Sequence, residues 1–271
     1  MNFITTSGED EPAVSKARRW LLIGFPLLLV AAFLALPWPL MEKLRAIGHT
    51  VCMLRPSHSH FLAGEQLPLE ARTMGMYAGF LITFGYLLVL RRGRAVRFPG
   101  KWMTVLLAGF VAVMGLDGLN SSAFEVGMVH LYVPSNTLRL ITGLLAGTAM
   151  GSFLLPLASP VLRAGNPPRA VLGSVKELAG LLVIESLFFF GIVSGAGWLL
   201  YPVSFIGAGG VVVLFFTISV AFIALLARKW SETSGRRDLL LYVDLALLLT
   251  VVELGMLLAF KLWMHQCPIQ A

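Results

Sequence analysis

The chain contains seven apolar runs, each about as long as a membrane is thick. A helix needs roughly 20 apolar residues to cross the hydrocarbon layer of a bilayer. Of the 271 residues, 57% are hydrophobic and only 13% are charged, which is too little polar surface to cover a water-soluble protein of this size. Backbone groups in lipid must be satisfied within a segment, so we expect an all-α, polytopic membrane helix bundle. The predicted spans are residues 20–40, 74–90, 102–119, 138–162, 178–200, 205–227 and 239–263.

The boundary between the fifth and sixth runs is the least well defined. Tyr201 and Pro202 are followed by Gly207, Gly209 and Gly210, and both proline and glycine interrupt helices. This stretch predicts either a tight turn between two spans or one broken element. A count of six or eight spans therefore stays open.

Basic residues are shared unevenly between the two sides of the predicted bundle. Fifteen of the 21 lysines and arginines lie on the side of the N-terminal tail, and such an excess marks the cytoplasmic side. We expect the N-terminus inside, the C-terminus outside, and a multi-pass protein of the inner (plasma) membrane. The fifteen are Lys16, Arg18, Arg19, Arg91, Arg92, Arg94, Arg97, Lys101, Arg163, Arg169, Lys176, Arg228, Lys229, Arg236 and Arg237.

The first apolar run is interpreted as a retained helix rather than a cleaved signal. It is longer than the ~7–15 residues of a signal-peptide core, and residues 1–18 before it form a predicted cytoplasmic tail. The net charge of +7 is divided among short clusters. We therefore expect membrane lipids, and not nucleic acid, as the counter-charge, with other membrane subunits as further partners.

All five histidines and both cysteines fall on the predicted outer side. This concentration of polar chemistry indicates an outward-facing site, although polar residues also collect in loops without any function. The residues are His49, His58, His60, His130, His265, Cys52 and Cys267.

The connection between the first two spans, residues 41–73, is long for a helix bundle. Its apolar residues repeat at alternating steps of four and three, which is typical of an amphipathic helix. We expect this helix to lie in the membrane interface and to end before Pro56. The apolar stripe consists of Leu40, Leu44, Ile47, Val51 and Leu54.

His49 and Cys52 are three residues apart, so on a helix they share a face, as two ligands of one metal ion do. His58 and His60 are candidates to complete a site for a divalent metal such as zinc. Two alternate histidines in a loop are also commonly just solvated. A disulfide between Cys52 and Cys267 is an equal alternative, because both face an oxidising compartment, and it competes with the metal for Cys52.

Charged residues within the spans need partners in lipid. Asp117 and Arg139 lie near the outer ends of consecutive spans, and we expect them to form an ion pair. Arg139 is followed at steps of four by glycines, and a small-residue seam of this kind lets helices pack closely. The seam is Gly143, Gly147 and Gly151 in the fourth span, matched by Gly75 and Gly79 in the second.

Three further carboxyl groups lie deeper in the predicted membrane: Glu185, Asp244 and Glu253. Such acids relay protons or bind transported cations in other membrane proteins. Asp244 and Glu253 are nine residues apart, so they point in roughly opposite directions and do not line one path.

A pattern of small, polar and charged residues lies between residues 48 and 156. It consists of Cys52, Arg55, Pro56, Ser59, Leu67, Pro68, Leu69, Ala71, Arg72, Gly75, Tyr77, Gly79, Asp117, Gly118, Asn136, Leu138, Arg139, Thr142 and Gly143. By this pattern the stretch resembles a bacterial family of predicted membrane proteins known only as domain of unknown function 2085. The resemblance implies a membrane fold and carries no established activity. Where the family pattern has a histidine and a cysteine, this chain has Met53 and Glu70, so a metal site implied by the family is weakened.

These patterns predict a four-helix membrane module over residues 19–165 and a three-helix module over residues 166–271. No phosphate-binding loop, dinucleotide fingerprint, nucleophile elbow or zinc-protease motif occurs. The leading hypothesis is a binding or accessory subunit whose outward polar site holds a metal, a ligand or a partner. The alternative is an ion- or proton-coupled transporter using Glu185 and Glu253. A membrane enzyme that uses the polar cluster Glu70, Arg72, Asp117 and Arg139 on a lipid head group is the third hypothesis.

Overall fold

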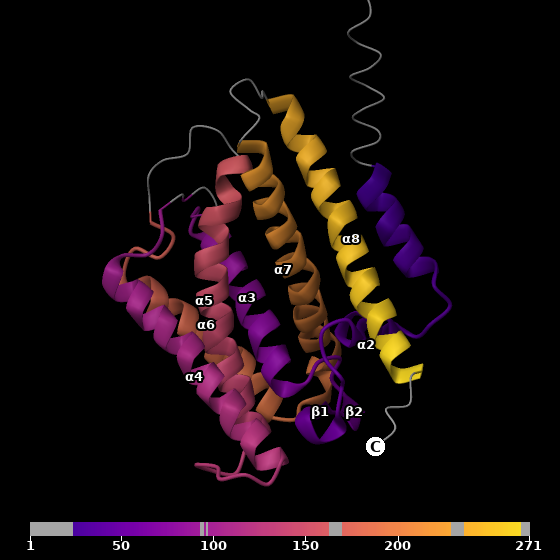
Figure 1. Ribbon diagram of the computed structural model, residues 1–271, viewed down its shortest axis with the longest axis vertical. Coiled ribbons are helices and arrows are strands. Elements are labelled where there is room, and N and C mark those ends of the chain that lie inside the picture. Colours follow the sequence, from indigo (N-terminus) through magenta and orange to yellow (C-terminus); the bar gives the residue numbers. More distant parts are fainter. Residues whose placement is uncertain (1–23, 93–94, 96, 163–169, 229–235, 267–271) are drawn as a thin grey trace, which may run out of the picture.

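The computed structural model describes residues 24–92, 95, 97–162, 170–228 and 236–266, and long helices dominate it (Figure 1). The short elements lie together at one end of the bundle. After a first helix, Gly24–Ala35, the elements are α2 (Leu40–His49), η1 (Pro56–His58), β1 (Phe61–Leu62), β2 (Glu65–Gln66), α3 (Ala71–Val89), α4 (Lys101–Glu125), α5 (Asn136–Leu162), α6 (Val175–Val193), η2 (Gly197–Leu199), α7 (Leu200–Arg228) and α8 (Arg236–Gln266).

Five helices of the described chain are long and apolar enough to cross a membrane, and they lie in α3, α4, α5, α7 and α8. A sixth span is counted if Gly24–Ala35 and α2 form one broken span. Helix α6 has 19 residues, as α3 has, but every 18-residue stretch of it contains Lys176, Glu177 and Glu185, whereas each of the five helices has such a stretch with at most two charged residues. The predicted membrane helix bundle is confirmed, and the count of seven spans stays a prediction.

The first predicted span does not continue as one straight helix to residue 40. Helix Gly24–Ala35 and α2 meet at 116°, because Pro37 and Pro39 interrupt the backbone hydrogen bonding between them. Helix α2 ends at His49, earlier than the predicted stop before Pro56. Its position relative to a membrane stays a prediction.

The stretch from residue 201 to residue 210 is neither a turn nor a broken element. Helix α6 ends at Val193, and the chain reverses through Gly195, whose φ is +70°. Pro202 then lies in the first turn of α7, where no backbone N–H is needed. Gly210 packs against α3, since a Cβ there would lie 2.2 Å from the Tyr77 carbonyl oxygen.

Helices α3 and α5 form the centre of the bundle, and their backbones touch. A Cβ on Gly143 would lie 2.3 Å from the Arg72 carbonyl oxygen, and one on Gly75 would lie 2.3 Å from the Leu140 carbonyl oxygen. No side chain fits at these distances, so the predicted glycine seam is confirmed. Because α7 also packs on α3, the division into modules 19–165 and 166–271 stays a prediction.

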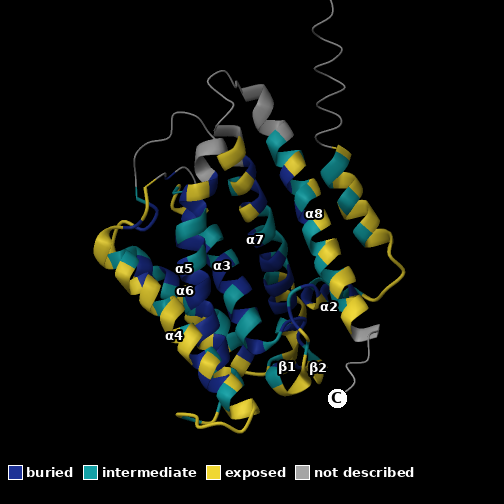
Figure 2. Cartoon of the chain, viewed as in Figure 1, coloured by how far each residue is buried: buried dark blue, intermediate teal, exposed yellow. Residues whose placement is uncertain are grey.

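Helices α4 and α8 lie at the periphery of the bundle, where Figure 2 shows long exposed faces. In an apolar stretch of 18 residues, only 11% of α4 is buried, and the same share of α8, whereas 67% of α5 is buried. The exposed residues of α4 include Val105, Leu116 and Leu119. An apolar exposed face of this kind is solvated by lipid or covered by another subunit.

The hairpin β1–β2 and the loop 126–135 lie at the same end of the bundle (Figure 1). Helices α3 and α5 begin at this end and α4 finishes there. We call it the hairpin end, and it gathers the starts of the two central helices.

Replacing Gly147 by alanine is expected to destabilise the protein by about 1–3 kcal/mol, as overpacking does. The new Cβ would lie 2.4 Å from the Met76 carbonyl oxygen and 2.6 Å from the Phe80 amide nitrogen, both on α3. Thermal unfolding in detergent measures the loss. The matched control is Gly109→Ala on α4, where a Cβ meets nothing within 4 Å. Equal unfolding temperatures for the two variants would contradict the close packing of α3 on α5.

Candidate functional site

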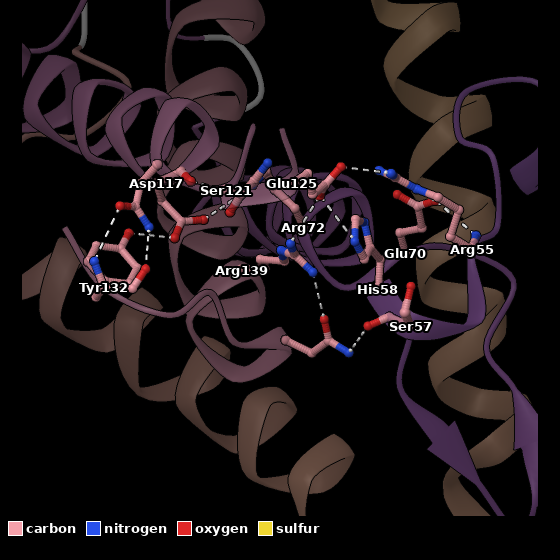
Figure 3. A network of polar contacts seen from close by, with 12 residues as sticks. Arg55, Ser57, His58, Glu70, Arg72, Asp117, Ser121, Glu125, Tyr132 and Arg139 are labelled. Carbon is pink, nitrogen blue, oxygen red and sulfur yellow. Dashed lines mark hydrogen bonds and ion pairs between the residues drawn. The ribbon is translucent and has the colours of Figure 1, made fainter. Parts of the chain in front are cut away.

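Charged side chains from several segments converge at the hairpin end, as Figure 3 shows. They come from the connection before α3, from the start of α3, from the last turns of α4 and from the start of α5. We call this group the polar cluster. Its members are Arg55, His58, Glu70, Arg72, Asp117, Glu125, Tyr132 and Arg139.

Asp117 is the most buried member, with only 2% of its surface exposed. Arg72 Nη2 donates to its Oδ2 at 2.6 Å, and the Tyr132 hydroxyl donates to its Oδ1 at 2.7 Å. Arg72 also donates to Ser121 Oγ at 3.0 Å. A buried carboxylate needs this combination of a counter-charge and hydrogen-bond donors.

The predicted ion pair between Asp117 and Arg139 is wrong, because the arginine that Asp117 pairs with is Arg72. Arg139 instead reaches Glu125, with 3.5 Å between Nη2 and Oε1. The reason is the length of α4, which continues past the predicted end at residue 119 to Glu125. Two further turns of helix carry a second carboxylate to Arg139.

Glu125 accepts from three donors on separate elements. Arg55 Nη1 lies 3.0 Å from its Oε2, and His58 Nε2 lies 3.1 Å from its Oε1. Arg139 is the third donor, and it also donates to Asn136 Oδ1 at 3.1 Å. The backbone N–H of Arg55 donates to Glu70 Oε1 at 2.9 Å. Glu125 thus ties the connection before α3 to the start of α5.

The polar cluster is balanced in charge. Burial, and then the nearby Arg139 and Arg55, lower the pKa of His58 despite the attraction of Glu125, so His58 is neutral near pH 7. Within the described residues, the three arginines of the cluster then face the three carboxylates Glu70, Asp117 and Glu125. No surplus positive charge is left in it to attract an anion.

The cluster also fixes the conformation of the loop 126–135. Asn120 Nδ2 donates to the Tyr132 carbonyl oxygen at 2.9 Å, and the Leu131 N–H donates to Asn120 Oδ1 at 2.7 Å. Burial, followed by the hydrogen bond to Asp117, raises the pKa of Tyr132 to about 12. Tyr132 therefore stays a donor at neutral pH and anchors the loop to α4.

The side chains of this anchored loop are mostly apolar and exposed. Val129 is 97% exposed and Leu131 is 89% exposed. His130 contacts Phe124 edge to face, with 4.9 Å between ring centroids. We call the exposed apolar residues the loop patch, which Figure 2 colours yellow beyond the end of α4. It consists of Val126, Met128, Val129, Leu131 and Val133.

The predicted metal ligands do not converge. His49 is exposed whereas Cys52 is buried, because α2 ends at His49 and a shared helix face no longer applies. His58 is engaged with Glu125, and burial lowers the pKa of His60. Among the residues that the structure describes, no group of three histidine, cysteine, aspartate or glutamate side chains is placed to hold a metal ion.

Cys52 is buried, and its Sγ donates to the Gly48 carbonyl oxygen at 3.4 Å. Burial raises the pKa of this thiol, which makes it a poor nucleophile and a poor metal ligand at neutral pH. The predicted disulfide partner Cys267, and the side chain of His265, lie outside the described residues.

The three deeper carboxyl groups occupy separate positions. Glu185 on α6 is buried and accepts from the Thr148 hydroxyl of α5 at 2.5 Å. Glu253 on α8 accepts from the Ser219 hydroxyl of α7 at 3.2 Å. Asp244 is half-buried on α8. Within the described part of the chain, Glu185 and Glu253 thus have no hydrogen-bond partner in common.

Glu125, Tyr132 and Asn120 were not predicted from the sequence as members of a site. An apolar run ends where polar residues begin, but a helix continues as long as its backbone is hydrogen-bonded. The signal was available in residues 119–125, which contain no proline and no glycine and so permit α4 to continue.

Replacing Asp117 by asparagine is expected to destabilise the protein by about 3 kcal/mol, since the Arg72 guanidinium loses its counter-charge. Adding Arg72→Gln should restore part of the loss, because both charges are then gone. Arg45→Gln is the control: it removes ion pairs with the exposed Glu42 and Glu65 and should cost about 0–1 kcal/mol. Similar unfolding temperatures for Asp117→Asn and Arg45→Gln would contradict a buried ion pair.

Comparison with known proteins agrees with the membrane fold. The chain is 26% identical over 114 residues to an uncharacterised protein of Methanocaldococcus jannaschii, an alignment that covers 42% of this chain and 67% of that protein. No solved structure matches the chain. Residues 52–153 match the family of predicted membrane proteins called domain of unknown function 2085, so the predicted resemblance is confirmed and this chain is a membrane protein.

Proposed function

We propose that this chain is a binding or accessory subunit of a membrane complex, and that the loop patch is the surface that contacts its partner. The observation that carries the proposal is that a loop of exposed apolar side chains is held rigidly by buried polar groups. Asp117, which is 2% exposed, and Asn120, which is 6% exposed, both anchor it.

A rigid loop favours a protein partner over lipid. Lipid chains are fluid and adapt to any apolar shape, so contact with lipid needs no fixed loop conformation. A protein interface gains affinity when a loop is already ordered in its bound form. The Tyr132 and Asn120 hydrogen bonds supply that order, and the apolar patch supplies a surface of the kind found at the centre of interfaces.

The charge balance of the polar cluster argues against a small anionic ligand. A site for a phosphate or a lipid head group needs a surplus of positive charge, whereas each arginine of the cluster has a carboxylate within 3.5 Å. The same pairing makes Glu70, Arg72, Asp117 and Arg139 a frame for the loop rather than catalytic groups. The metal version of the hypothesis has no group of three ligands to support it among the described residues.

The second candidate function is an ion- or proton-coupled transporter that uses Glu185 and Glu253. In its favour, Glu185 is 3% exposed inside the bundle. Against it, Glu185 contacts Thr148 of α5 whereas Glu253 contacts Ser219 of α7. The two carboxyl groups do not share a path, and for this reason we favour the accessory subunit.

We further infer that the hairpin end faces outward from an inner membrane, with seven spans that include α6 and with α2 in the interface. The basis is that six of the 21 lysines and arginines belong to this side. Several of the six pair with carboxylates, including Arg45, Arg55, Arg72 and Arg139. Unpaired positive charge keeps a loop in the cytoplasm. Because these ion pairs lower the unpaired positive charge at the hairpin end, they favour its outward placement.

A reporter enzyme that needs disulfide bonds for activity should be active when it is fused after Ala271. Disulfides form outside the cytoplasm, and the predicted orientation places the C-terminus there. Fusion of the same enzyme after Leu162, which ends α5, should be inactive. An active fusion after Leu162 with an inactive one after Ala271 would reverse the orientation.

A photoreactive phenylalanine analogue at the position of Val129 should form a discrete adduct with a second polypeptide in native membranes. The reason is that Val129 is almost fully exposed at the centre of the loop patch. Gel electrophoresis followed by mass spectrometry identifies the adduct. The matched control is the same analogue at Leu116, which is 64% exposed on α4 and should give lipid adducts alone.

Tyr132→Phe removes the hydroxyl that reaches Asp117 and leaves the loop patch unchanged in composition. If the ordered loop is what the partner recognises, this variant should lower the yield of the Val129 adduct several-fold. Two results would rule out a preordered docking loop: adducts of Val129 with lipid alone, or a yield of the Val129 protein adduct that Tyr132→Phe leaves unchanged.

A further inference from the structure

A second polar group lies inside the bundle, away from the polar cluster. Glu185 is near the middle of α6 and is 3% exposed, while Thr148 of α5 and Thr83 of α3 are both fully buried. The Thr148 hydroxyl donates to Glu185 Oε1 at 2.5 Å. Three helices thus place a carboxyl group and two hydroxyl groups together.

Two oxygens of this group have no hydrogen-bond partner among the described residues. They are Glu185 Oε2 and Thr83 Oγ1, and both are buried. The Thr83 hydroxyl is a neighbour of the Glu185 carboxyl. Buried polar atoms in native proteins nearly always have partners, so two orphaned neighbours call for an explanation.

Glu185 also has no counter-charge among the described residues. No lysine, arginine or histidine in the described part of the chain forms an ion pair with it, in contrast to Asp117 and Glu125. An unpaired charge inside a membrane helix bundle is costly. A protonated carboxyl group avoids that cost, because it is neutral and its O–H can donate to the orphaned Thr83 oxygen.

We propose that Glu185, Thr148 and Thr83 form a proton-binding site within the membrane bundle. When the site is loaded, the proton is on Glu185 Oε2 and is shared with Thr83 Oγ1, while Thr148 donates to Oε1. When the proton passes to water, the Thr83 hydroxyl rotates and donates to the carboxylate. The two hydroxyl groups therefore support both states.

The donor set fits a proton better than a metal cation. Hard cations take about six or more oxygen ligands, and here two unengaged side-chain oxygens face each other. The nearby Ser152 hydroxyl is already committed, since it donates to the Thr148 carbonyl oxygen at 2.7 Å. This site is separate from the loop patch, and the inference does not depend on the proposed function.

Infrared spectroscopy of the full chain in lipid vesicles tests the proposal, since a protonated carboxylic acid has a C=O stretching band that a carboxylate lacks. We expect such a band at neutral pH that is lost in Glu185→Gln and that declines as the pH is raised. Glutamine preserves the packing because its amide can accept from Thr148 and donate to Thr83. The matched control is Glu177→Gln on the same helix: Glu177 pairs with Arg92 at 2.5 Å, so this variant should keep the band.

Each other result overturns the proposal. A spectrum unchanged by Glu185→Gln would mean that Glu185 is ionised in the bundle. A Glu185 band that stays constant at every pH at which the protein is folded would mean a permanently neutral carboxyl group that exchanges no proton. A band that Na⁺ removes at constant pH would mean a metal cation site.

Discussion

The backbone contact between α3 and α5 is the constraint on which the rest of the structure depends. Glycines on both helices let the two backbones approach so closely that Gly143 lies against the Arg72 carbonyl oxygen. This contact brings the start of α3 beside the start of α5, and with it Arg72 beside Arg139. Two guanidinium groups in a partly buried setting repel each other. Each of them therefore needs a carboxylate partner nearby. Helix α4 supplies these carboxylates as Asp117 and Glu125.

The pairing at the hairpin end has a structural outcome that reaches beyond the two central helices. Asp117 is shared between Arg72 and Tyr132, so the ion pair that joins α3 to α4 also holds the loop 126–135. Asn120 completes the anchor from the same helix. A buried polar frame thus carries an exposed apolar surface at a fixed position. This combination of order and exposed apolar area is what a partner-binding surface requires.

Acidic side chains in this bundle are stabilised in two different ways, according to their position along the helices. At the hairpin end, Asp117 and Glu125 have arginine partners, so they are held as carboxylates. Near the middle of α6, Glu185 has a hydroxyl partner in Thr148 and a neighbour in Thr83, and it forms no ion pair with any described residue. Hydroxyl groups stabilise either protonation state, whereas an arginine stabilises the charged one alone. The difference separates a rigid frame from a group that can exchange a proton.

The sequence by itself determined the class of fold, because apolar runs of membrane length have one stable solution in lipid. It also determined the glycine seam. Glycines at steps of four lie on one face of a helix and allow a close contact there, however the neighbouring helix is rotated about its axis. It also predicted that Glu70, Arg72, Asp117 and Arg139 belong to one polar cluster. Only the tertiary structure decided which charges pair, because pairing depends on helix length and rotation about the axis. An apolar run predicts only the part of a helix that lies in lipid. Helix α4 continues beyond its apolar run to Glu125. For the same reason, only the tertiary structure showed the anchored loop and the hydroxyl groups around Glu185.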